Sequence, residues 1–198
     1  MTTFSDIQKF DVSLEFDAGV TLPDETELIL AFHTLIQGQS LNDTLIDVAN
    51  YLHVTTGPGI LLIGHKAFRA VKLDQAHAGI SVSGRRFHKS ADSSFLQQHV
   101  FALIEFGKAL ERYFERELFK SQSLTVRLND RRYQLNDYSP QSLLAAVDED
   151  LRELGLDLAR LGFRESDARE QLAIDVLLRE PQDLNVLRDR SNSKDQAA

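Results

Sequence analysis

The hydrophobic pattern begins with an alternating segment. Residues 10–16 read Phe-Asp-Val-Ser-Leu-Glu-Phe, which is the period of a half-buried strand with its apolar residues on one face. Pro23 and a cap between residues 21 and 24 then precede apolar positions at helical spacing, namely Leu28, Phe32, Leu35 and Ile36. Gly38 is expected to end that helix.

Residues 45–87 contain short runs rich in valine and isoleucine, separated by glycine-bearing turns. The pattern predicts a meander of four strands with turns near residues 55–58, 64–67 and 75–79. Residues 60–63 are apolar on both parities, which is typical of a central strand covered on both faces. Helices from elsewhere in the chain are expected to supply that cover.

The second half of the chain alternates helical and strand-like patterns. Residues 93–119 predict a helix with Gly107 on its apolar stripe, and a long amphipathic helix is expected from Ser139 to Gly162. Residues 123–128 and 131–136 predict a hairpin around Asn129-Asp130. Residues 165–178 fit a helix or, through alternating Leu172, Ile174, Val176 and Leu178, a strand, and we favour the helix.

Together these elements predict the α+β class: a mainly antiparallel sheet, made of the meander, an N-terminal strand and a later hairpin, covered by three to four helices. One domain is expected over residues 1–180, followed by a mobile polar tail over residues 181–198. The leucine stripe from Leu144 to Leu161 fits a dimer seam, but core packing is the preferred interpretation.

Composition narrows the classes of protein. The chain has no cysteine, which excludes disulfides, zinc thiolates, iron–sulfur ligation and a cysteine nucleophile. The first residues lack a secretory signal pattern and no segment approaches eighteen consecutive apolar residues, so a cytoplasmic protein with no membrane span is expected. The net charge of −8 disfavours nucleic acid as a partner.

Charge is unevenly distributed despite this acidic balance. Residues 64–89 hold six lysines and arginines but a single acidic residue, Asp74. In a meander, two of the turns bring most of these cations to one sheet edge, where guanidinium groups could bind a carboxylate or phosphate. The predicted ligand-binding residues are His65, Lys66, Arg69, Arg85, Arg86, His88 and Lys89. The alternative is that these cations are solvated or pair with the acidic first 38 residues.

Other motifs carry less weight. The glycines of residues 57–65 precede a strand rather than a helix, so they do not form a phosphate-binding loop. His53, His65 and His77 are spaced twelve apart, but successive turns of a meander lie at opposite edges, so no metal site and no cofactor are predicted.

The sequence therefore favours a non-enzymatic binding or regulatory module, oligomeric, with an anionic small molecule or an acidic protein as partner and a homodimer as one form of assembly. The alternative is a small enzyme acting on an anionic substrate. His65 would be its general acid or base, oriented by Asp47 or Asp74, with Arg85 or Arg86 as the anion clamp.

Overall fold

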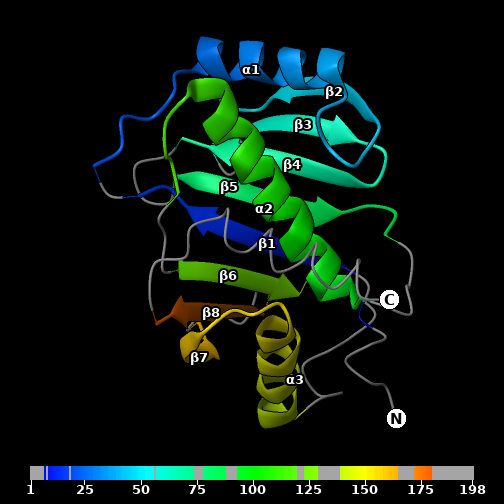
Figure 1. The fold of residues 1–198 in the computed structure, drawn as a ribbon, viewed down its shortest axis with the longest axis vertical. Coiled ribbons are helices and arrows are strands. Elements are labelled where there is room, and N and C mark those ends of the chain that lie inside the picture. Colours follow the sequence, from blue (N-terminus) through cyan, green and yellow to red (C-terminus); the bar gives the residue numbers. More distant parts are fainter. Residues whose placement is uncertain are drawn as a thin grey trace.

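The computed structural model describes residues 7, 9–17, 19–55, 57–73, 78–87, 93–119, 123–128, 139–164 and 172–179. Within them, one antiparallel sheet carries three helices (Figure 1). The eight strands are β1 (Phe10–Glu15), β2 (Leu45–Asn50), β3 (Ile60–Gly64), β4 (Ala67–Lys72), β5 (Gly79–Gly84), β6 (Ser123–Leu128), β7 (Leu158–Phe163) and β8 (Ala173–Leu178). The helices are α1 (Glu25–Gly38), α2 (Phe95–Phe114) and α3 (Pro140–Glu153). The α+β class with an antiparallel sheet is thus confirmed, whereas the details of the strand arrangement differ from the prediction.

The strand order across the sheet is β2-β3-β4-β5-β1-β6-β8-β7. Strands β2 to β5 pair antiparallel with their neighbours in sequence, as a meander does. The N-terminal strand β1 inserts between β5 and β6, so it joins the meander to the C-terminal strands. One continuous sheet therefore runs the length of the molecule.

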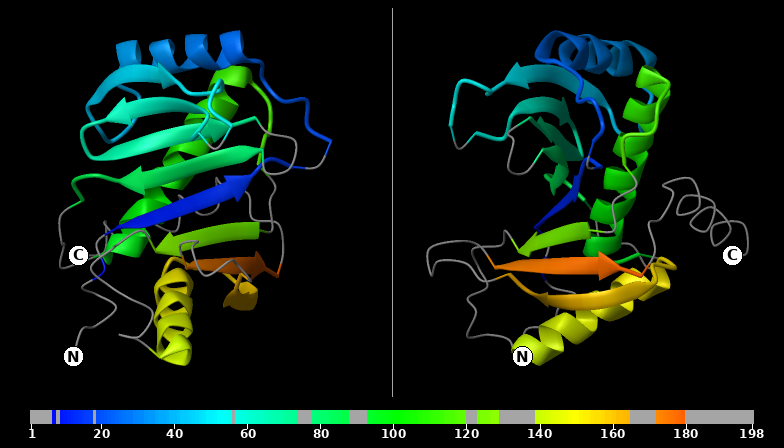
Figure 2. Two further views of the ribbon diagram at one scale, coloured as in Figure 1. Left: turned by 180° about the vertical axis from the view of Figure 1, so that it is seen from behind. Right: turned by 90° about the vertical axis from the view of Figure 1, so that its left-hand side faces the viewer.

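The three helices lie on the same face of this sheet. Helix α2 crosses β5 and β1, α1 lies along β2 and β3, and α3 packs against β7 (Figure 2). Phe32 of α1 meets Phe106 of α2, and Ser94 before α2 donates a hydrogen bond to Asp150 of α3. The buried core fills the space between these helices and the sheet. We call the opposite side of the sheet the helix-free face.

Helix ends follow the sequence signals. Asp24 caps α1 and forms a reciprocal capping box with Glu27, and Ser94 and Gln97 form the same arrangement at the start of α2. Gly107 is buried on α2, in keeping with its position on the apolar stripe. Capping satisfies backbone donors that the first turn of a helix leaves free, which defines where each helix begins.

Two predictions for the C-terminal half were wrong. The long helix ends at Glu153, not Gly162, because Gly155 has a φ of 79° and turns the chain. Residues 158–163 form strand β7 instead, with Leu158 opposite Leu178. The favoured helix over 165–178 is also wrong for residues 173–178, which form β8 and bury their alternating apolar residues. The two strands satisfy each other's backbone groups, which outweighs local helical spacing.

The expected two-sided cover of residues 60–63 is also not found among the described elements. Ile60 and Leu62 face the helices and are fully buried, but Leu61 and Ile63 lie on the helix-free face, half-buried. The described helices thus cover only one side of β3.

Several predictions lie outside the described residues. These are most of the 75–79 turn, the tail over 181–198, and residues 131–136, the second strand of the predicted hairpin. The hairpin pairing itself is wrong for residues 123–128, because β1 and β8 occupy the two edges of β6. Among the described helices, none combines the length and apolarity that crossing a membrane requires.

Candidate functional site

Two turns at the same end of the sheet meet through the backbone. His65 and Lys66 form the turn between β3 and β4, and Arg85 and Arg86 directly follow β5. The carbonyl of Lys66 accepts hydrogen bonds from the backbone N–H of both Arg85 (2.8 Å) and Arg86 (3.0 Å). The predicted convergence of these four residues is therefore observed. We call His65, Lys66, Arg85 and Arg86 the basic turn pair.

The two arginines point in different directions. An Nη1 of Arg86 lies 2.8 Å from Nε2 of His65, and because arginine can only donate, this histidine nitrogen accepts. The Arg85 guanidinium instead lies over the Phe68 ring, 4.9 Å from its centroid, on the helix-free face. Arg86 thus joins the turn edge, whereas Arg85 flanks it.

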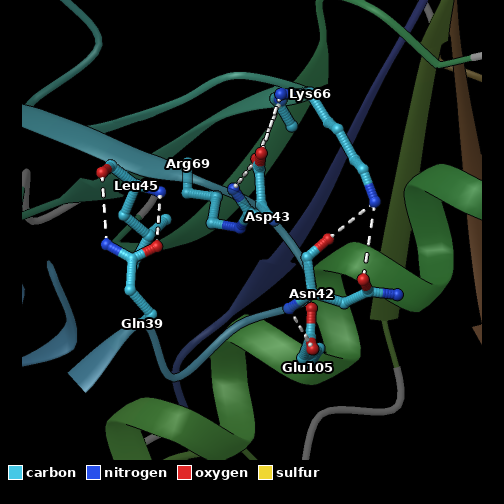
Figure 3. Close-up of polar contacts among 8 residues, drawn as sticks. Gln39, Asn42, Asp43, Leu45, Lys66, Arg69 and Glu105 are labelled. Carbon is cyan, nitrogen blue, oxygen red and sulfur yellow. Dashed lines mark hydrogen bonds and ion pairs between the residues drawn. The ribbon is translucent and has the colours of Figure 1, made fainter.

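Lys66 extends the turn edge toward the connection between α1 and β2. Its ammonium donates to the backbone oxygen and the side-chain oxygen of Asn42, at 3.1 and 3.4 Å (Figure 3). The backbone N–H of Asn42 donates in turn to the Glu105 carboxylate of α2. These contacts hold Lys66 beside neutral oxygens, which do not cancel its charge.

Asp43 supports the turn from below. Its carboxylate accepts from the backbone N–H of Lys66 at 2.8 Å and of Ala67 at 3.2 Å, and from the Arg69 guanidinium at 2.8 Å (Figure 3). A Cβ at Gly64 would collide with this carboxylate, so a glycine is required there. Burial raises the pKa of Asp43, but the bonds from Arg69 and Lys66 outweigh it and leave the pKa below its ordinary value.

Arg69 is not part of the accessible edge, contrary to the sequence prediction. On β4 it shares its parity with Ala67 and Val71, so it points to the helix side and is only 1% exposed. Its ion pair with Asp43 is buried. This orientation could have been read from the sequence, because Arg69 lies between the apolar residues Ala67 and Val71 on the same face of the strand. Arg69 therefore positions Asp43 and the turn, and it cannot reach a ligand in solution.

The accessible cations have no acidic partner within the described part of the chain. The ion pairs found there join Arg69 to Asp43, Arg152 to Asp148, Arg164 to Asp175 and Arg179 to Asp157. None involves Lys66, Arg85 or Arg86, so the alternative of internal pairing with the acidic N-terminal region has no support there. His88 and Lys89, the remaining predicted site residues, lie outside the described residues.

A buried histidine anchors the second turn to α2. His99 is fully buried, and its Nε2 accepts from the backbone N–H of Gly84, which directly precedes Arg85. Its Nδ1 faces the carbonyl of Phe95, so this nitrogen carries the proton. Burial lowers the pKa of His99 to about 4, against a smaller opposing effect of the Phe95 carbonyl. The anchor is thus a neutral imidazole.

The geometry of the described residues gives no support to the enzymatic alternative or to a metal site, which the sequence did not predict. His53 and His65 lie at opposite ends of β3, and the described residues contain no group of three potential metal ligands. Asp47, one of the two proposed orienting carboxylates, bonds to the backbone of Val48, and Asp74 lies outside the described residues.

Comparison of the chain with protein-family models, with curated proteins and with solved structures gives no match. The functional argument consequently rests on the geometry of the basic turn pair.

Proposed function

We propose that the protein is a non-enzymatic binding module whose basic turn pair binds a multiply charged anionic group. The observation that carries the proposal is that the backbone N–H groups of Arg85 and Arg86 both bond to the carbonyl of Lys66. This brings three cationic residues together, and none of them has an ionic partner in the described part of the chain. A protein of net charge −8 gains no solubility from gathering unpaired cations at one place.

The arrangement suits a phosphate or a polycarboxylate. Arg86 is held by His65 and Lys66 by Asn42, so both cations are partly ordered before a ligand arrives. Pre-ordering reduces the entropy that binding must overcome, and a guanidinium group matches two oxygens of an anion at once. The turn itself is fixed from below by the buried Asp43 carboxylate.

The enzymatic alternative, with His65 as general acid or base, has less support. Nε2 of His65 already accepts the hydrogen bond from Arg86, so a general base at this atom would first have to give up that contact. We therefore assign His65 to orienting Arg86.

We expect Arg85→Ala plus Arg86→Ala to weaken binding of inorganic pyrophosphate or citrate at least about tenfold, because each charge-assisted hydrogen bond contributes roughly 1.5 to 3 kcal/mol. The melting temperature should change little, since both side chains are exposed. Isothermal titration calorimetry at low ionic strength gives the affinities.

The matched control is Arg112→Ala plus Arg160→Ala, which removes the same formal charge from exposed positions on α2 and β7. This control should retain the parent affinity. Equal weakening by both double variants would mean that net charge alone determines binding, and no binding by the parent to either anion would refute the site.

A further inference from the structure

The helix-free face carries an apolar patch that no described element covers. Its members are the outward-facing residues of β3 and β4, which pair across the two strands: Ile63 with Phe68, and Leu61 with Ala70. Leu61, Ile63 and Phe68 are half-buried, whereas the small Ala70 side chain is only 4% exposed. None of the four belongs to the core that the helices cover. We call these four residues the outer patch.

The sequence of β3 is typical of a strand whose two faces are both buried, including the helix-free face. Residues 60–63 are apolar on both parities, a pattern typical of a strand buried on both sides. The helices account for Ile60 and Leu62 but not for Leu61 and Ile63. An apolar sheet face of this kind is generally packed against a further layer, as in sandwiches of two sheets.

Opposite charges flank the outer patch on its two sides. Asp47 of β2 is the cross-strand partner of Ile63, and Ser83 of β5 is the partner of Phe68. The row across the four strands thus begins at Asp47 and ends beneath the Arg85 guanidinium, which lies over Phe68. Asp47 is exposed, and neither Asp47 nor Arg85 takes part in the ion pairs of the described region.

We propose that the outer patch is the interface of a homodimer in which a second copy of this chain packs its own outer patch face to face. A two-fold axis parallel to the strands, between β3 and β4, places β2 of one copy opposite β5 of the other. Asp47 then faces Arg85 of the second copy, twice per dimer. The patch is therefore complementary to itself in charge, so a second copy of this chain is a sufficient partner.

The dimer and the anion site share Arg85 but differ in their other groups. Arg85 turns toward the helix-free face, whereas Arg86, Lys66 and His65 form the turn edge. The dimer does not rest on anion binding, and Asp47 belongs to the dimer contact alone. A variant at Asp47 therefore tests the interface without touching the anion site, and a variant at Arg86 does the reverse.

Sedimentation equilibrium of the full chain is expected to give twice the 22.4 kDa chain mass at micromolar concentration. Asp47→Arg and Arg85→Asp should each raise the dimer dissociation constant at least about tenfold, because each places like charges face to face. The double variant should return to within about threefold of the parent. Ile63→Lys, at the centre of the patch, should be monomeric.

Asp47→Asn is the control for folding, because its amide oxygen still accepts the Val48 N–H bond that the carboxylate makes. It should keep the parent melting temperature and weaken the dimer less than Asp47→Arg. A monomeric parent chain at hundred-micromolar concentration would overturn the dimer. The two-fold pairing of Asp47 with Arg85 would be overturned if Asp47→Arg and Arg85→Asp each dimerised like the parent. It would also be overturned if the double variant had a dissociation constant as high as that of either single variant.

Discussion

Replacing Asp43 with alanine is expected to lower the free energy of unfolding by about 3 to 5 kcal/mol, the cost of leaving one member of a buried ion pair alone. Arg69 would remain as a buried guanidinium without its carboxylate. The backbone N–H groups of Lys66 and Ala67 would also lose their acceptor. Urea denaturation at neutral pH measures the loss.

Asp148→Ala is the matched comparison, since it breaks the exposed pair with Arg152 on the surface of α3. This variant should lose far less stability than Asp43→Ala, because an exposed pair is screened by water. Similar losses for the two variants would show that the Asp43 network is no more than a surface contact, and would remove the rigid support assigned to the β3–β4 turn.

Stability is expected to fall by roughly 3 kcal/mol between pH 6.5 and pH 4 through His99 alone. The pKa of His99 is lowered from 6.5 to about 4 in the folded protein, chiefly by burial. Below pH 6.5 the unfolded chain therefore takes up a proton at this residue that the folded chain refuses, and folding loses free energy as pH falls. The loss levels off below pH 4, where the folded chain takes up the proton as well.

The measurement is the free energy of unfolding against pH for the parent chain and for His99→Phe, which keeps a ring but cannot titrate. Carboxylates contribute equally to both proteins, so the difference between the two curves isolates His99. Asp150, whose pKa burial raises, favours the folded state at low pH and cancels in this difference. Parallel curves would contradict a neutral, buried His99 anchor.

The sequence predicted elements correctly where the spacing of apolar residues matches the face that is buried in the fold. The alternation in β1 and the short runs of apolar residues, rich in valine and isoleucine, over β2 to β5 predict strands because one face of each is buried by helices. The sequence was misleading where leucines fit both the helical and the strand period. Leu158 and Leu161 continue the apolar stripe of a helix, but Gly155 turns the chain, and β8 supplies the hydrogen bonds that make residues 158–163 a strand. Such long-range pairing leaves no local trace.

The candidate site shows the same division. The meander was enough to bring His65 and Lys66 near Arg85 and Arg86, because consecutive hairpins return to the same edge. Arg69 was misplaced, although its parity with Ala67 and Val71 points it inward. The role of Asp43 depends on its contact with Arg69, which is 26 residues away in the sequence. The role of Phe68 depends on the Arg85 guanidinium that lies over its ring. Neither contact can be predicted from composition and spacing.

The most direct test of the basic turn pair is an NMR titration of the ¹⁵N-labelled protein with inorganic pyrophosphate. We predict that the largest chemical-shift changes occur at the backbone amides of His65, Lys66, Arg85 and Arg86 and at the Nε–H of Arg86. The amides at the start of α1 and α2, near Asp24 and Ser94, should move little. Shift changes confined to those helix starts, or absent from the four turn residues at saturation, would contradict the proposed anion site.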